Sequence, residues 1–401
     1  MTSTDRYTVI SSDCHAGANH ETYRDYLEAK YVDDFDAWRA KYSNPFRDLQ
    51  DDGKSRNWDN DRRIGEMDAD GVVAEVIYPN TVPPFFPTGV VITRPPTPEQ
   101  YELRMAGIKA HNRWLAEWCS EYPQRRAGIA QIFLNDVDDA IAETKWAAES
   151  GLRGGILVTP VPPDAPHIQP LYSDAYDELW AVCQDLDMPV NQHSGGAGMP
   201  DYGRHRATPL VWISEAQFYG RRGMIHMLLS GVFERFPRLK YILAEVGAGW
   251  LLETLPQLDL HHKSLVETGR IGELGFESDV ILPLSPSEYA ARNCWLGVSF
   301  AGPADIRARE ILGTDRIMWG SDYPHHEGTY PYTTEALQKA FAGIDRDDVT
   351  MMLSTNAAEV YGFDLDALDP IAAECGPLVD VVAEPLTEVP ADATSPAFTR
   401  A

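Results

Sequence analysis

An aspartate and a histidine two residues apart, Asp13 and His15, end an apolar segment near the start of the chain. Side chains two apart on a β-strand point to the same face, so this spacing would aim a carboxylate oxygen and an imidazole nitrogen into one space. Donors of these types bind divalent metal ions. A strand ending in Asp-x-His therefore predicts part of a metal site, although an aspartate that only caps a turn would look the same in isolation.

Three later apolar segments also end abruptly in a group that can bind a metal. They end in His193, Glu245 and Asp322, each followed by turn residues. A pair of histidines, His325 and His326, follows the last of them. A single strand-end histidine is more often a hydrogen-bonded part of the scaffold than a ligand, but several such ends in one chain favour a shared metal site.

The elements that must bring these side chains together alternate between short apolar runs and longer helical patterns. The expected strands are residues 7–13, 72–78, 127–134, 154–158, 188–193, 241–245, 293–300 and 316–322. The expected helices are residues 61–70, 97–122, 137–150, 173–186, 221–233, 250–268, 304–311 and 334–342. Such alternation builds a parallel sheet, and eight units over about 350 residues fit an α/β fold of the (β/α)8 TIM-barrel type. The alternative is an open doubly wound sheet, but no G-x-G-x-x-G follows the first strand.

Three long segments follow the first, second and fifth predicted strands, at residues 19–60, 80–96 and 195–220. In a TIM barrel the loops after strands surround the active site, so we expect these insertions on the functional side. We expect the barrel domain to span residues 1–363. Residues 364–401 form a tail rich in Ala, Pro, Asp and Glu, which we expect to be largely disordered.

The composition limits the partners. The chain has 34 Lys and Arg against 61 Asp and Glu, a formal net charge of −27, which repels nucleic acid and anionic membranes. We find no bilayer-spanning segment and no signal peptide, and the five scattered cysteines favour a reducing compartment. We therefore expect a cytoplasmic protein with a small-molecule substrate and no nucleic-acid or membrane partner. Assembly into a homo-oligomer stays open.

Further motifs extend the strand-end pattern into a family resemblance. They are EMDADGV at residues 66–72, NRWLA at 112–116, SGVFERFP at 230–237 and WGSDYPH at 319–325. Over residues 7–362 the chain resembles the amidohydrolase superfamily, in particular the amidohydrolase-related branch that includes aminocarboxymuconate-semialdehyde decarboxylase. This resemblance implies a TIM barrel with one or two divalent metals, bound by His-x-His on the first strand, a histidine on the fifth and sixth strands, and an aspartate on the eighth.

The chain departs from that family pattern at two positions. Asp13 stands in place of the first histidine and Glu245 in place of the sixth-strand histidine. Each change replaces a neutral nitrogen with an anionic oxygen, which favours Fe, Mn or a second ion over a single Zn. We therefore predict one or two divalent ions (Fe, Zn or Mn). The predicted ligands are Asp13, His15, His193, Glu245 and Asp322, with His325 or His326 as an additional ligand or acid/base.

The first reaction that this resemblance implies is hydrolysis of a small molecule. The metal would activate water, Asp322 would take its proton, and His193 or His326 would stabilise the developing oxyanion. The carboxylate-rich set leaves two alternatives, a nonheme diiron monooxygenase on the same fold and a metal-dependent decarboxylase. A non-catalytic barrel that keeps a metal for stability is disfavoured, because closed structural sites prefer Cys and His.

Aromatic side chains on or near the predicted strand ends bear on the substrate. If some of them face the site, the ligand is bulky and partly apolar, with one end that binds the metal. These residues are Tyr78, Phe85, Phe86, Trp212, Phe218 and Tyr219.

Overall fold

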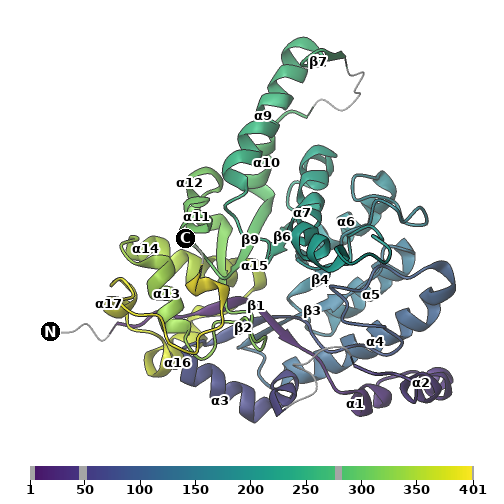
Figure 1. Ribbon diagram of the computed structural model, residues 1–401, viewed down its shortest axis with the longest axis horizontal. Coiled ribbons are helices and arrows are strands. Elements are labelled where there is room, and N and C mark those ends of the chain that lie inside the picture. The colour runs from purple at the N-terminus through teal and green to yellow at the C-terminus, as the bar shows by residue number, and fades with distance from the viewer. Residues whose placement is uncertain (1–4, 45–51, 276–281, 400–401) are drawn as a thin grey trace.

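The computed structural model describes residues 5–44, 52–275 and 282–399. Eight parallel strands form one sheet whose spatial order follows the chain (Figure 1). They are β1 (Ile10–Ala16), β2 (Ala74–Pro79), β3 (Arg126–Gln131), β4 (Gly155–Leu157), β5 (Val190–His193), β6 (Tyr241–Ala244), β9 (Cys294–Ser299) and β10 (Ile317–Gly320). Each lies within a few residues of a predicted strand.

The first and last strands meet, so the sheet is a nearly closed barrel. The backbone N–H of His15 donates to the carbonyl of Tyr323 at 2.7 Å, and the N–H of Asp322 donates to the carbonyl of Asp13 at 2.8 Å. A parallel bridge joins Cys14 to Tyr323. The prediction of a (β/α)8 TIM barrel is therefore confirmed.

Helices follow and cover the strands. They are α1 (His20–Asp25), α2 (Val32–Arg39), α3 (Asn60–Asp70), α4 (Pro98–Ser120), α5 (Val137–Glu149), α6 (Asp177–Asp185), α7 (Thr208–Leu229), α8 (Val232–Arg235), α9 (Leu251–Thr268), α10 (Pro286–Asn293), α11 (Pro303–Arg307), α12 (Arg309–Leu312), α13 (Thr333–Phe341), α14 (Arg346–Thr350), α15 (Asn356–Tyr361), α16 (Leu365–Cys375) and α17 (Val379–Val382). With the two-stranded hairpin of β7 (Arg270–Ile271) and β8 (Leu274–Gly275), α9 forms an arm that projects from the barrel (Figure 1). Within the described ranges, no helix combines the length and the apolar character needed to cross a bilayer.

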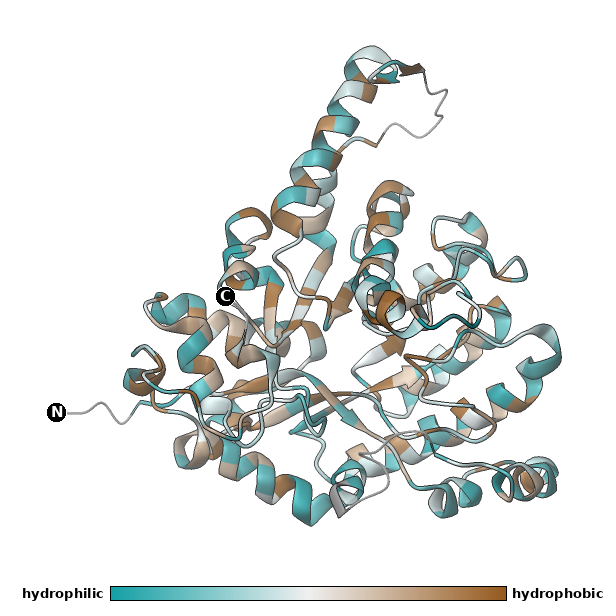
Figure 2. Ribbon diagram, in the orientation of Figure 1, coloured by the Kyte–Doolittle hydropathy of each residue, from teal (hydrophilic) through white to brown (hydrophobic). Residues whose placement is uncertain are grey.

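Both faces of the barrel sheet are buried, which explains why its strands are nearly continuous apolar runs. Ile10, Val76, Ile129 and Ile242 belong to a buried cluster that includes residues of several strands. A second, larger cluster joins strand residues to the helices around them. Figure 2 shows hydrophobic residues on the central strands and hydrophilic ones on the outer faces of helices such as α3.

A buried ion pair ties α3 to the first strands. The Arg63 guanidinium lies 2.6 Å from the Glu75 carboxylate, both side chains being fully buried, and Arg126 contacts the same carboxylate at 3.3 Å. Arg63 also donates to the carbonyl oxygen of His15 at 2.8 Å. This buried charged network therefore fixes the backbone at the end of β1, which carries Asp13 and His15.

The insertion after β5 differs from its prediction. The sequence indicates a loop over residues 195–220 and a helix from Arg221, but α7 begins at Thr208. The first half of α7 shows no helical periodicity because apolar side chains on it, such as Leu210 and Ile213, are exposed. Trp212 anchors this half, since its ring packs so closely on Gly196 that a Cβ there would lie 2.1 Å away.

In the tail, where the composition predicts little order, the structure has α16, α17 and several buried side chains. Leu368 and Ala372 of α16 are buried in the barrel-centred cluster, and the N–H of Val379 donates to the carbonyl of Asp5. Near the end of the tail, Phe398 packs in a small cluster with Phe300. The apolar residues of the tail are too few to form a core of their own, but they complete surfaces that the barrel already presents.

Candidate metal centre

Three of the predicted ligands meet at the carboxyl ends of β1 and β5. Nε2 of His193 lies 3.2 Å from Oδ1 of Asp13, and Nε2 of His15 lies 3.3 Å from the same oxygen. The three side chains are buried, and one donor atom from each lies within 4.8 Å of the others. This grouping has the residue types and the spacing of a divalent-metal site.

Asp322 joins the group from the end of β10. Its Oδ1 lies 3.2 Å from Nε2 of His15 and 2.8 Å from Nδ1 of His325. His15, Asp322 and His325 form a second set of donor atoms with the same mutual spacing. The two sets share His15, so they describe one continuous cluster at the barrel mouth.

A backbone carbonyl behind each of two histidines sets which ring nitrogen faces the cluster. Nδ1 of His15 lies 3.2 Å from the carbonyl oxygen of Pro79, and Nδ1 of His193 lies 3.0 Å from that of Ser194. A carbonyl can only accept, so both Nδ1 atoms carry a hydrogen, and Nε2 is the ring atom whose lone pair becomes available to a metal when the imidazole is neutral. Both Nε2 atoms face Oδ1 of Asp13, at 3.3 Å for His15 and 3.2 Å for His193.

Unpaired buried atoms indicate that the cluster fits a cation. Nε2 of His15 and Oδ2 of Asp322 are inaccessible to water and make no hydrogen bond of good geometry with any described residue. A buried polar atom without a partner is costly, and binding of a metal ion would satisfy such atoms. The donor set, two imidazoles and two carboxylates, is one that Mn, Fe or Zn accepts.

Charges within the cluster shift the protonation of its members. Burial alone would raise the pKa of Asp13, but His193 and His15 hold it well below its ordinary value. Burial alone would lower the pKa values of His15 and His193, but the neighbouring carboxylates raise each to about 9. Burial and the nearby Asp322 carboxylate raise the pKa of Glu245 to about 7. The cluster is therefore a mutually charged network in which cations and anions alternate.

Two predicted site residues lie outside both donor sets. Glu245 contacts the Nδ1 side of His193 at 3.5 Å, away from Asp13, and accepts a hydrogen bond from the Ser194 hydroxyl. Its carboxylate thus lies behind a ligand instead of beside it. His326 is exposed, and its backbone carbonyl accepts from the Thr394 hydroxyl. Adjacent histidines in an irregular loop point in different directions, so the sequence could not tell His325 from His326.

Sequence reasoning missed the hydroxyl and amide groups that support these side chains. Ser299 donates to Oδ2 of Asp13, and the Asn80 amide oxygen lies 3.0 Å from Nε2 of His325. Ser299 carried a signal, because it is the polar end of an apolar strand. Asn80, which directly follows β2, carried the same signal.

Tight backbone geometry shapes the strand ends. Glu245, which directly follows β6, and Asp322, two residues after β10, have φ values of 58° and 59°, in the left-handed region that residues other than glycine rarely adopt. A Cβ on Gly320 would lie 2.7 Å from that of Asp13. Glycine is therefore needed at position 320 so that β10 can approach the Asp13 side chain.

The cluster opens into a cavity of about 280 Å³. His15, His193, Glu245 and His325 line its polar part. Its other walls come from the insertions after β2 and β5 and include Val91, Ile92, Trp212, Ile213 and Ala216. The prediction that these insertions surround the site agrees with this lining, and the cavity size suits a single-ring ligand with a polar end.

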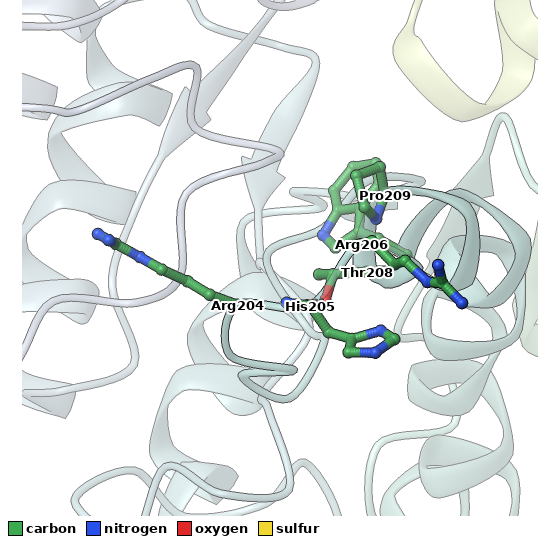
Figure 3. Close-up of a pocket in the computed structure, with 6 residues that line it drawn as sticks. Arg204, His205, Arg206, Thr208 and Pro209 are labelled. Carbon is green, nitrogen blue, oxygen red and sulfur yellow. Dashed lines mark hydrogen bonds between the residues drawn. The ribbon is translucent and has the colours of Figure 1, made fainter.

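A larger depression, of about 680 Å³, lies at the start of α7 (Figure 3). Its lining includes Arg204, His205 and Arg206, but Arg204 and Arg206 extend in opposite directions and do not converge on a ligand. Its lining also contains no carboxylate. The smaller cavity, with which the depression shares only Trp212, is therefore the candidate site.

Comparison with protein families gives a match over most of the chain, to the family described as amidohydrolase, across residues 12–363. A gamma-resorcylate decarboxylase of Polaromonas sp. is 27% identical over 225 residues, which are 53% of this chain and 64% of that protein. This chain thus spans less than two thirds of that relative. A 2-amino-3-carboxymuconate-6-semialdehyde decarboxylase of Dictyostelium discoideum is 26% identical over 325 residues, which are 77% of this chain and 78% of that protein.

Solved structures share the fold. A 5-carboxyvanillate decarboxylase from Sphingomonas paucimobilis superposes with a TM-score of 0.63 at 20% identity, covering 89% of this chain and 100% of that chain. A dihydroxybenzoic acid decarboxylase from Polaromonas sp., solved with manganese and 2-nitroresorcinol, gives 0.59 at 19% identity, covering 89% and 97%. With the family match over residues 12–363, the conclusion is that this chain belongs to the amidohydrolase family.

Proposed function

We propose that this protein is a divalent-metal-dependent decarboxylase of a small aromatic or unsaturated carboxylic acid. The observation that carries the proposal is the buried Asp13, His15 and His193 group at the base of a small cavity, in a chain whose matched relatives are named decarboxylases. Hydrolysis, the reaction first expected from the sequence, finds no support among those named relatives.

Asp13, His15, His193 and Asp322 would hold the metal, and manganese is the ion named with three related structures. When bound, a divalent cation supplies Lewis acidity that withdraws electron density from the carbon bearing the carboxylate. The apolar wall at Val91, Ile92 and Trp212 packs against the substrate ring and excludes water.

Glu245 is the group we assign to proton delivery. Its carboxyl lines the cavity, and the Ser194 hydroxyl holds one of its oxygens. As the bond between the ring carbon and the carboxylate breaks, its electron pair stays on the carbon and forms a C–H bond with the proton from Glu245. CO2 leaves, and water returns a proton to the carboxylate.

The experiment is CO2 release from a panel of carboxylic acids under nitrogen, with protein loaded with Mn²⁺. The panel contains 2,6-dihydroxybenzoate and 5-carboxyvanillate, the acids named for related structures. We expect CO2 and the corresponding decarboxylated product from at least one acid. Glu245→Gln should keep its metal and lose turnover by about 100-fold or more, the scale of general-acid catalysis.

Two results would overturn this proposal. One is release of an acid from an ester or amide by the same preparation with no CO2 from any member of the panel. The other is turnover that requires and consumes oxygen.

A further inference from the structure

Both ring nitrogens of His325 already contact an oxygen. Nδ1 lies 2.8 Å from Oδ1 of Asp322, and Nε2 lies 3.0 Å from Oδ1 of Asn80. These are hydrogen-bond distances, too short for a metal ion to lie between the atoms. The assignment of His325 as a ligand therefore depends on which of these contacts can be given up.

The Asn80 contact is fixed by a chain of amides. Nδ2 of Asn57 donates to the carbonyl oxygen of Lys54 at 2.8 Å, and this carbonyl can only accept. Oδ1 of Asn57 is therefore the atom that accepts from Nδ2 of Asn80, at 2.6 Å. Oδ1 of Asn80 consequently faces His325 as an acceptor, so Nε2 of His325 must carry a hydrogen and has no lone pair for a metal.

This series of hydrogen bonds also affects the Asp322 carboxylate. Nδ1 of His325 and, at 3.2 Å, Nε2 of His15 both lie against Oδ1 of Asp322, whereas the other oxygen, Oδ2, is buried and has no hydrogen-bond partner among the described residues. Hydrogen bonds of this kind commonly orient metal ligands in proteins.

We propose that Asn57 and Asn80 are positioning residues that keep His325 out of the metal's ligand shell and, through His325, hold the Asp322 carboxylate in place with Oδ2 left free to bind the metal. The inference rests on the metal site of the proposed function and deepens it. Asn57 ends a short helical turn, Asp52–Asn57, in the insertion after β1, and only 2% of its surface is exposed. This insertion therefore contributes to the metal centre without touching the metal.

Mn²⁺ binding separates positioning residues from ligands. Purified variants are titrated with Mn²⁺ alone, and free Mn²⁺ is followed by its EPR signal, which reports stoichiometry and Kd without any substrate. The set is His325→Ala, Asn80→Leu, Asn80→Asp and Asn57→Ala, with His193→Ala as the ligand reference. Asn19→Ala is the matched control, because Asn19 lies in the same insertion but only caps α1 through Thr22.

We expect His325→Ala and Asn80→Leu still to saturate with the wild-type number of Mn²⁺ ions, with Kd weakened about 10- to 100-fold. Asn80→Asp keeps an acceptor for His325 and should stay within a few-fold of wild type, whereas a purely structural role would make the Asp and Leu variants alike. Asn57→Ala, which frees the Asn80 amide to turn, should weaken Mn²⁺ less than Asn80→Leu. Asn19→Ala should bind as wild type does.

A folded His325→Ala protein that fails to saturate, as expected for His193→Ala, would make His325 a ligand and overturn the inference while leaving the proposed metal site intact. Wild-type affinity in Asn80→Leu would also overturn it. Absence of Mn²⁺ binding by the wild-type protein would instead count against the proposed function.

Discussion

At the scale of single residues, each buried donor is held by a second group that the ligand pattern alone does not reveal. Oδ2 of Asp13 accepts from Ser299, and Nδ1 of His193 lies against the Ser194 carbonyl. Such partners orient a ligand before the metal arrives, which reduces the entropy lost on binding. The residues at the strand ends therefore provide the candidate metal-binding atoms, and neighbouring groups orient these atoms by hydrogen bonds.

The buried charges behind β1 lead to a prediction on stability. Glu75→Gln keeps the side-chain volume but leaves Arg63 and Arg126 without their shared buried anion. Removing one partner of a buried ion pair typically costs about 3–5 kcal/mol of unfolding free energy. Urea denaturation followed by circular dichroism measures this loss.

Asp36→Ala is the matched control, because it removes an acidic partner of the exposed arginine Arg24. Solvent screens that pair, so the urea midpoint should hardly change. Equal midpoints for Glu75→Gln and wild type would show that the buried network does not stabilise the barrel.

At the scale of elements, three strands that lead into the site are each followed by a residue with positive φ. Glu245 follows β6, Phe300 follows β9 and Asp322 follows β10, with φ of 58°, 57° and 59°. Each such backbone conformation costs on the order of 1–3 kcal/mol in a residue other than glycine. The surrounding packing must offset this cost. The resulting backbone turns place Glu245 and Asp322 at the carboxyl-terminal end of the barrel.

A buried carboxyl between two helices leads to a prediction on pH. Asp70, at the end of α3, accepts from the backbone N–H and the hydroxyl of Thr333, at the start of α13. Burial raises the pKa of Asp70 to about 7. Between the unfolded-state pKa and this value the folded protein binds more protons, so its stability falls as the pH rises and then levels off above about pH 7.

Asp70→Asn cannot titrate and retains the shape of the contact. Relative to this variant, the wild-type protein should lose unfolding free energy between about pH 4 and about pH 7, as measured by urea denaturation at several pH values. A constant difference between the two proteins across this range would contradict a raised pKa at Asp70.

The end of the tail leads to a prediction on local order. Phe398, 7% exposed, packs near Phe300 and Ala336, and Lys339 of α13 donates to its carbonyl oxygen. Phe398→Ala should release residues 384–399 to proteolysis and lower the unfolding free energy by about 3 kcal/mol, the low end for a buried Phe. Mass spectrometry of timed digests locates the cuts.

Phe218→Ala makes the same change at a side chain that is 60% exposed, and should leave digestion of the tail as in wild type. If the wild-type tail is cut as quickly as that of Phe398→Ala, the disorder expected from composition is correct and the docking is wrong.

At the scale of the whole molecule, an acidic chain collects several carboxylates in one buried place. The formal net charge is −27, and Asp13, Glu245 and Asp322 all lie in or against the metal cluster. A bound cation would relieve their repulsion, and ligands that bind only the folded state stabilise it.

Removing the metal should therefore destabilise the protein. With Mn²⁺ at about 100 times its Kd, the unfolding free energy should rise by about 2.7 kcal/mol, and EDTA should reverse the gain in Tm. His193→Ala has the same acidic surface but lacks one donor, so Mn²⁺ should raise its Tm much less. An equal rise in both proteins would assign the effect to the acidic surface instead of the cluster.

Most of the barrel could be predicted because its signals are local. Each of the eight strands is a short apolar run between turn residues, and Asp13, His15, His193 and Asp322 stand at the ends of such runs. A strand that is buried on both faces has apolar residues at consecutive positions, which can be recognised in the sequence. The helical first half of α7 and the ordered tail carry no such signature, because their packing partners lie elsewhere in the chain.

The sequence by itself determined the fold class and the types of donor atoms that the site contains, since both follow from residue identity and spacing along one strand. Only the tertiary structure decided which of those donors meet. It put Glu245 behind His193 and left His326 exposed. It also joined Asn57, Asn80 and His325, which lie in three separate segments after β1, β2 and β10. Hydrogen bonds between segments far apart in the sequence form only when the barrel closes, so no local sequence pattern predicts them.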